Sequence, residues 1–294
     1  SRMEHYLEWK DPYPFTPEKV FTDNKADAAN DESDAGIVGL AAEGTLAYQT
    51  AQDLMPNSQQ VLIAGLFSKT NFLDMVQNFT VFEPTDGRVV KKIARYQQFR
   101  AVHKTMARIK SGKTRKERGG VIWHTQGSGK SLTMVFLTVK MRRDAELSQY
   151  KLVFITDRTQ LDDQITATFA RTQQETIHQA KSVSHLKELL AKDSSDVITA
   201  MVQKFQDSAD DFNFPLLNDS HKIIVLADEA HRTQNGTLAM AINAALPNAP
   251  KIAFTGTPLI KSMKTNNEFD SYIDTYTIEQ AVQDGATIQI LYEG

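Results

Sequence analysis

One segment constrains the fold of this chain more than any other, because a short apolar run is followed at once by a glycine-rich stretch and a helical pattern. The run is Val121-Ile122-Trp123, the stretch is His124-Thr125-Gln126-Gly127-Ser128-Gly129-Lys130-Ser131, and the helical pattern covers residues 131–143. A strand, a glycine-rich loop and a helix in this order are the setting of a phosphate-binding loop. The strict pattern has glycine where this chain has His124. An ordinary Gly-Ser turn with a chance lysine is the alternative.

The residue types in this stretch suit the binding of a nucleotide. Glycines let successive backbone N–H groups curl around a β-phosphate, and the helix that follows adds its positive N-terminal end. Lys130 can reach the β- and γ-phosphates, where it would be catalytic, and the Ser131 hydroxyl can coordinate Mg²⁺. We therefore expect a nucleotide site formed by Thr125, Gln126, Gly127, Ser128, Gly129, Lys130 and Ser131.

A second candidate site follows the apolar run Val225-Leu226-Ala227, where the chain reads Asp228-Glu229-Ala230-His231. Acidic residues at the carboxyl end of a buried strand face the crevice in which α/β sheets bind ligands. We expect Asp228 to hold Mg²⁺, Glu229 to orient or deprotonate the attacking water, and His231 to couple the nucleotide to other parts of the protein. Taken alone, Asp228 could simply cap a helix and Glu229 could be solvated.

A third segment, Thr255-Gly256-Thr257-Pro258, also ends an apolar strand. A Thr-Gly-Thr-Pro turn means little alone, since Gly and Pro mark turns everywhere. Because the other two segments are also present, we expect the threonine hydroxyls to hydrogen-bond the acidic pair Asp228-Glu229. Thr255, Gly256 and Thr257 would then couple the state of that pair to other parts of the protein. Three such segments in one order, each after a predicted strand, are hard to explain by chance.

From residue 119 onward, apolar runs typical of buried strands alternate with helical segments. The remaining runs are residues 152–155, 197–199, 223–226 and 252–254, and the other helical segments are residues 159–169, 183–192 and 236–246. Continuous apolar strands joined by crossover helices are typical of a parallel sheet covered on both faces. We therefore predict an α/β fold with a doubly wound, mostly parallel sheet over residues 119–294.

The chain before this sheet divides into two predicted parts. Residues 1–60 hold clustered prolines and an acidic stretch, so we expect an irregular or mobile lead-in. Residues 61–118 are expected to form a helix and a short strand over 61–82 and an amphipathic helix over 89–110. The basic segment at 108–118 is expected to be a solvated loop rather than a grip on phosphates.

Composition excludes several classes of protein. The chain has 33 basic and 36 acidic residues, and its net charge of −3 argues against binding nucleic acid by bulk charge. The absence of cysteine excludes disulfides, thiolate zinc sites and cysteine nucleophiles. The seven histidines show no metal-ligand spacing, and neither a secretion signal nor an apolar run of about 18 residues is present. We expect a cytoplasmic protein.

The three segments together resemble motifs I, II and III of the first RecA-like domain of superfamily 2 helicases and translocases, which are P-loop NTPases with a DEAH box. Further segments resemble the R subunit of type I restriction enzymes, the HsdR family, which carries the motor and the nuclease. These segments are Ile-Thr-Asp-Arg-Thr-Gln-Leu-Asp-Asp-Gln at 155–164, Val-Gln-Lys-Phe at 202–205, Arg-Tyr-Gln-Gln-Phe-Arg-Ala-Val at 95–102 and Asn-Phe-Thr-Val-Phe at 78–82. The resemblance runs from about Val61 to the C-terminus.

This resemblance implies ATP-driven translocation along double-stranded DNA, with Mg²⁺, by a subunit that works with methylation and specificity subunits. By position, it implies that Gln98 and Arg95 contact adenine and that Arg158, Gln203 and Lys204 contact the DNA backbone. Solvated side chains after a strand are the alternative for Arg158 and Lys204.

The resemblance also carries expectations about missing parts. Glu8-Trp9-Lys10 matches half of the family's nuclease motif, but no aspartate-bearing strand precedes it, so we expect no nuclease site there. The chain stops soon after Thr257, before a second RecA-like domain, so we expect a fragment that hydrolyses ATP slowly by itself. Two alternatives stay open: another superfamily 2 DNA translocase or helicase, and a non-hydrolysing nucleic-acid-binding module with a decayed phosphate loop.

Overall fold

The computed structural model describes residues 8–16, 19, 57–85, 88–156, 177–201, 215–228, 242–257 and 271–288. The chain divides into two compact units. The first consists of Ser1–Gln77 and Arg95–Arg100, and the second of Asn78–Ala94 and Ala101–Gly294. The boundaries predicted at residues 60 and 118 stay a prediction.

A seven-stranded sheet forms the frame of the second unit, and all of its paired strands run parallel. In spatial order the strands are β5 (Ile177–Gln179), β6 (Val197–Met201), β4 (Lys151–Thr156), β7 (Ile223–Asp228), β8 (Lys251–Thr255), β3 (Gly120–His124) and β9 (Tyr272–Tyr276). The order departs from the sequence order, so crossover connections join the strands. The predicted α/β fold with a mostly parallel sheet is confirmed, although β5 and β9 were not among the predicted strands.

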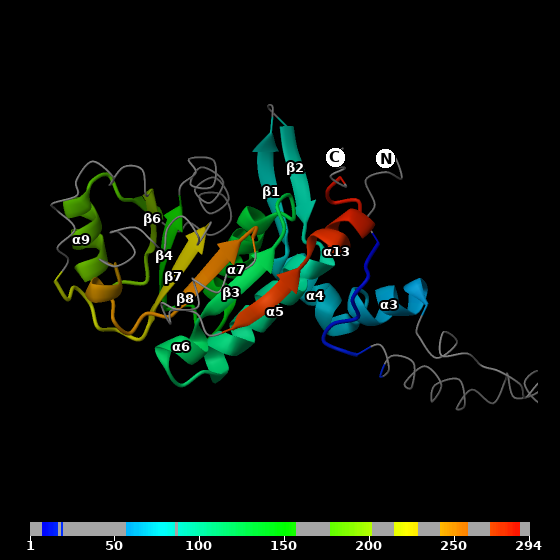
Figure 1. Ribbon diagram of the computed structural model, residues 1–294, viewed down its shortest axis with the longest axis horizontal. Helices are drawn as coiled ribbons and strands as arrows, with labels where there is room; N and C mark the ends of the chain where they lie inside the picture. Colours follow the sequence, from blue (N-terminus) through cyan, green and yellow to red (C-terminus); the bar gives the residue numbers. More distant parts are fainter. Residues whose placement is uncertain are drawn as a thin grey trace, which may run out of the picture. The chain divides into compact units, whose positions relative to one another are not determined.

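Two predicted crossover helices are present, α7 (Lys130–Arg143) and α9 (Val183–Ala191), and α9 lies beside β6 at one end of the sheet (Figure 1). A core of buried aliphatic side chains joins α9 and residues 242–249 to strands β4, β6 and β7. The helix predicted at 159–169 lies outside the described residues, and residues 242–245 of the one predicted at 236–246 are helical. No helix in the described ranges is long and apolar enough to cross a bilayer.

The helix predicted over residues 89–110 is shorter than expected. It begins only at α5 (Tyr96–Ser111), because β2 (Arg88–Ile93) pairs with β1 (Thr80–Thr85) in a separate antiparallel hairpin (Figure 1). The predicted helix began too early because the apolar residues of this segment continue the pattern of the helix that follows. Three of them, Val89, Val90 and Ile93, are β-branched, and such residues favour a strand.

The basic segment at 108–118 is not the solvated loop that was predicted. It contains the end of α5 and a short helix, α6 (Arg115–Arg118), whose N-cap Thr114 and Glu117 form a capping box. Arg118 is buried and donates to the carbonyls of Ile109 and His221 and to the Tyr150 hydroxyl. Guanidinium groups here satisfy carbonyl oxygens of the protein itself, so part of the basic character is structural.

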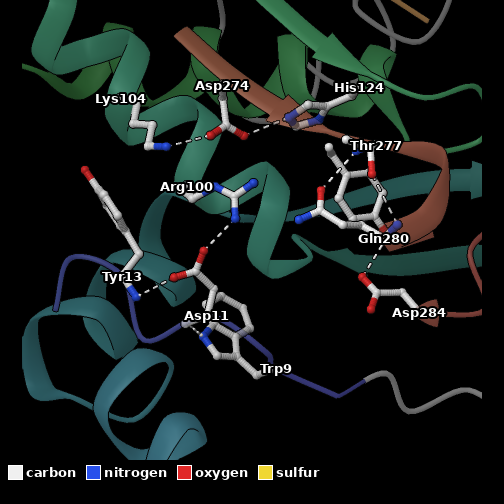
Figure 2. Close-up of polar contacts among 11 residues, drawn as sticks. Trp9, Asp11, Tyr13, Arg100, Lys104, His124, Asp274, Thr277, Gln280 and Asp284 are labelled. Carbon is white, nitrogen blue, oxygen red and sulfur yellow. Dashed lines mark hydrogen bonds and ion pairs between the residues drawn. The ribbon is translucent and has the colours of Figure 1, made fainter. Parts of the chain in front are cut away.

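The first unit contains α3 (Ser58–Gly65) and α4 (Lys69–Asn78), whereas residues 8–16 contain no helix or strand. Trp9 is nevertheless buried, and its ring lies edge-on to those of Tyr96 and Phe99 at centroid distances of 6.4 and 5.7 Å. Asp11 forms an ion pair with Arg100 at 2.6 Å (Figure 2). Trp9 of the rejected Glu-Trp-Lys motif thus packs in an aromatic cluster.

Candidate functional site

The glycine-rich segment forms a tight loop between β3 and α7. Gly127 and Gly129 have φ values of 82° and 83°, a left-handed conformation that favours glycine. The Ser128 N–H closes the turn by donating to the Thr125 carbonyl at 3.2 Å. His124 is the last residue of β3, so its backbone is extended and glycine is not needed there. The departure from the strict pattern is therefore compatible with the loop.

Two groups of this loop are suited to receive an anion. Helix α7 begins with Gly129 as its N-cap and has no side-chain cap hydrogen bond, and the N–H groups and positive end of a helix N-terminus suit a phosphate. Ser128 is buried, and its hydroxyl has no hydrogen-bond partner among the described residues. A buried hydroxyl without a partner is costly, so this loop fits an added polar group such as a phosphate.

The amine of Lys130 is held at the centre of the site. Lys130 is 9% exposed, and its Nζ atom donates to the His124 carbonyl at 3.3 Å. A Cβ atom placed on Gly256 would lie 3.2 Å from Nζ and 3.6 Å from the Gln126 backbone nitrogen. The first and third sequence motifs are therefore in contact at Lys130 and Gly256. Because Gly256 has no side chain, it leaves room for the lysine amine.

The second motif lies on the neighbouring strand. Asp228, the last residue of β7, is 2% exposed and pairs in register with Phe254 of β8. In β8 the next residue, Thr255, pairs with Trp123 of β3. The three motifs thus follow the carboxyl ends of three adjacent strands, β7, β8 and β3, where parallel sheets bind their ligands.

The Thr255 hydroxyl forms its hydrogen bonds inside its own turn. Its Oγ1 atom donates to the Thr257 carbonyl at 3.1 Å and accepts from the Thr257 N–H at 3.2 Å. This arrangement shapes the turn that carries Gly256 against Lys130. The coupling of Thr255, Gly256 and Thr257 to the acidic pair stays a prediction.

The predicted adenine-contacting residues belong to the first unit. The Oε1 atom of Gln98 accepts the Arg95 N–H at 2.8 Å, so this side chain closes the first turn of α5. Its neighbour Gln97 is fully buried, and neither of its amide atoms has a hydrogen-bond partner in the described part of the chain. Sequence reasoning did not single out Gln97, and only its position beside Gln98 could have suggested it.

Several predicted site residues lie outside the described residues. They are Glu229 and His231 of the second motif and the predicted DNA contacts Arg158, Gln203 and Lys204. Their roles stay predictions.

A segment without any predicted role lies directly against the loop. The Thr125 N–H donates to the Tyr276 carbonyl at 3.0 Å, and the His124 ring lies edge-on to the Tyr276 ring with centroids 5.8 Å apart. After β9 follows α13 (Ile278–Gln283), whose N-cap Thr277 and Gln280 form a capping box. The strand-favouring residues Tyr272, Ile273, Thr275 and Tyr276 and this Thr-x-x-Gln pattern were signals that could have revealed both elements.

Comparison with known proteins gives consistent results. A model of the SWI2/SNF2 ATPase family matches residues 97–294. The type I restriction enzyme HindI endonuclease subunit of Haemophilus influenzae is 36% identical in an alignment 254 residues long, which covers 80% of this chain and 24% of that protein. A protein of Methanocaldococcus jannaschii, named as a type I restriction enzyme MjaIXP endonuclease subunit, is 38% identical in an alignment 242 residues long, which covers 80% of this chain and 23% of that protein.

Among solved structures, a nuclease-deletion mutant of the Type ISP restriction-modification enzyme LlaGI in complex with a DNA substrate mimic is similar, with a TM-score of 0.44. It is 19% identical, and the match covers 66% of this chain and 21% of that one. The chain spans about a quarter of the length of the curated relatives that it matches. The predicted resemblance to type I restriction enzyme R subunits is confirmed by those relatives.

Proposed function

Because the chain belongs to the SWI2/SNF2 ATPase family, we propose that it binds ATP with Mg²⁺ and couples ATP hydrolysis to movement along double-stranded DNA. It would do so as the motor part of a type I restriction enzyme endonuclease subunit, in the cytoplasm and together with methylation and specificity subunits. The observation that carries the proposal is that the loop before Lys130, the residue Asp228 and the turn of Gly256 lie at the carboxyl ends of three adjacent strands, with Gly256 next to the Lys130 amine.

The residues present fit a magnesium nucleotide. A carboxylate on Asp228 and a hydroxyl on Ser131 are the oxygen ligands that Mg²⁺ prefers, and the loop offers backbone N–H groups and the buried Ser128 hydroxyl to phosphate. When bound, Mg²⁺ supplies positive charge to the phosphate oxygens. Asp228 and Ser131 would hold it.

The protein's own groups would then divide the work. The amine of Lys130 has three donors, so it would keep its hydrogen bond to the His124 carbonyl and add stronger, charge-assisted ones to the β- and γ-phosphate oxygens. Glu229 would orient the attacking water, and His231 would link the site to the rest of the motor. Arg158, Gln203 and Lys204 would contact the DNA backbone, which positions the duplex without reading its sequence.

The proposal is tested by titrating the chain with a fluorescent ATP analogue and Mg²⁺, with and without linear duplex DNA. We expect saturable binding that Lys130→Ala abolishes. The matched control is Lys116→Ala, which removes the same charge from an exposed position on α6 and leaves binding unchanged. An ATP hydrolysis rate that increases when duplex DNA is added would support the proposed motor function.

Two results would contradict the proposal. Binding that survives in Lys130→Ala would mean that the analogue binds elsewhere. A parent chain that binds DNA but no nucleotide at millimolar concentration would favour the alternative of a nucleic-acid-binding module with a decayed loop. The DNA contacts have their own test, since Lys204→Ala should weaken duplex binding and make its salt dependence shallower.

A further inference from the structure

Residues 271–288 follow the third motif and have no part in the proposed function, yet they support the phosphate loop from one side. Strand β9 pairs with β3 along residues 121–124, and the Thr125 N–H continues this pairing into the loop. Beyond α13, the Ala286 carbonyl lies 3.5 Å from the position of a Cβ on Gly127. The loop is therefore held by a segment that is distant in the sequence.

A buried carboxylate, that of Asp274, adds a side-chain contact between this segment and His124. The Oδ2 atom of Asp274 lies 2.9 Å from Nε2 of His124, and its Oδ1 atom lies 2.8 Å from Nζ of Lys104 on α5 (Figure 2). The side chains of His124 and Asp274 are 0% and 1% exposed, whereas that of Lys104 is 40% exposed. A carboxylate so deeply buried is tolerated only when its oxygens are paired, as both are here.

The pairing also fixes the histidine ring. A carboxylate accepts hydrogen bonds, so Nε2 of His124 carries the proton and donates it toward Asp274. In the strand register, Ile122 pairs with Asp274 and His124 pairs with Tyr276, so the His124 and Asp274 side chains emerge on the same face of the sheet. The imidazole is thus held by a carboxylate on one side and packed against Tyr276 on the other.

The backbone of the same histidine contacts the catalytic lysine. His124 begins the glycine-rich segment, and its carbonyl accepts the hydrogen bond from Lys130. Any rotation of the His124 peptide would move this carbonyl and the start of the loop together. The position of the Lys130 amine therefore depends on the anchoring of His124.

We propose that Asp274 is a positioning residue of the nucleotide site, which acts through His124 to fix the start of the phosphate loop and the amine of Lys130. Where the strict loop pattern has glycine, this chain has a side chain that serves as an anchor. The inference rests on the proposed function, since it assigns a role within the ATP site.

The test compares Asp274→Ala and Asp274→Asn with the parent in the titration with the fluorescent ATP analogue and Mg²⁺. We expect Asp274→Ala to raise the dissociation constant about tenfold, in the range known for residues that orient ligand-binding groups. The matched control is Asp144→Asn, which breaks an ion pair between another aspartate and Lys110 of the same helix α5. This control should lower stability and leave nucleotide affinity within about twofold of the parent value.

A double-mutant cycle with His124→Ala separates positioning from general destabilisation. If Asp274 acts through His124, Asp274→Ala costs little further affinity once His124 is truncated. If the Asp274 variants fail to fold, Lys104→Met tests the same carboxylate by removing its exposed ion-pair partner. The dissociation constant of the nucleotide should then rise about two- to threefold, as expected for an exposed ion pair.

The outcomes distinguish this inference from the function on which it rests. Unchanged affinity in Asp274→Ala, additive losses in the cycle, or an equal loss in Asp144→Asn would overturn the positioning role while Lys130→Ala still abolishes binding. A parent chain that binds no ATP analogue would overturn both the role of Asp274 and the proposed function.

Discussion

The contact between Gly256 and Lys130 predicts an unusual effect for Gly256→Ala. The new Cβ would lie 3.2 Å from the lysine Nζ atom, closer than the 3.4 Å at which ordinary contacts begin. The φ angle of Gly256 lies outside the left-handed region, so the backbone accepts alanine without strain. The clash is therefore confined to the end of a flexible side chain.

The expected magnitudes separate stability from binding. Replacing glycine by alanine at a compatible position stabilises by about 0.4–1 kcal/mol through the unfolded state. Moving the amine by a few tenths of an ångström costs little and partly offsets this gain, so the free energy of unfolding should change by less than about 1 kcal/mol. Since a misplacement of about 1 Å can cost a hundredfold in rate, we expect a loss of about tenfold in nucleotide affinity or turnover.

The assay measures nucleotide affinity in Gly256→Ala and, separately, the free energy of unfolding in urea in a double-mutant cycle with Lys130→Ala. In that background Nζ is gone, so Gly256→Ala should gain the full stabilisation, and the two substitutions should be non-additive by a few tenths of a kcal/mol or more. Unimpaired nucleotide binding in Gly256→Ala would refute the reasoning, and so would equal stability effects in both backgrounds.

Three further predictions concern the loop, an ion pair and a buried amide. Gly129→Ala should lower the free energy of unfolding by about 1–2 kcal/mol, measured by thermal melting, because its φ of 83° is unfavourable for alanine. Although burial opposes the effect, the hydrogen bond from Lys110 and backbone N–H groups lowers the pKa of Asp144. A carboxylate with a lowered pKa stabilises the fold at pH values above its unfolded-state pKa, and this stabilisation is lost as the pH falls through its folded-state pKa. The stability deficit of Asp144→Asn should therefore shrink below about pH 4 in acid denaturation. Gln97→Met should raise the free energy of unfolding in urea by about 1 kcal/mol, because it removes a buried amide without partners among the described residues.

The central sheet could be predicted because its signals are local. Strands such as β3, β4 and β7 are continuous apolar runs, and the loop after β3 is a glycine pattern read over a few residues. The fold class also predicted that the motifs lie at the carboxyl edge of the sheet, whereas the adjacency of β7, β8 and β3 is known only from the structure.

The supporting contacts could not be predicted, because they join residues that are far apart in the sequence. His124 and Asp274 are 150 positions apart, and no spacing rule connects them. The hairpin was missed because β2 and α5 share an amphipathic pattern that only pairing with β1 resolves. Arg118 was interpreted as solvated because its carbonyl partners, such as that of His221, become neighbours only in the fold.

The Lys130 amine is thus controlled from two sides by residues that never touch a nucleotide in this scheme. Gly256 leaves the space that the amine occupies, and Asp274 fixes the carbonyl that holds it through His124. Gly256→Ala would therefore displace the amine by crowding and Asp274→Ala by loss of support. Because the two causes act on one atom, the double variant should lose less affinity than the product of the single losses, whereas independent defects would multiply.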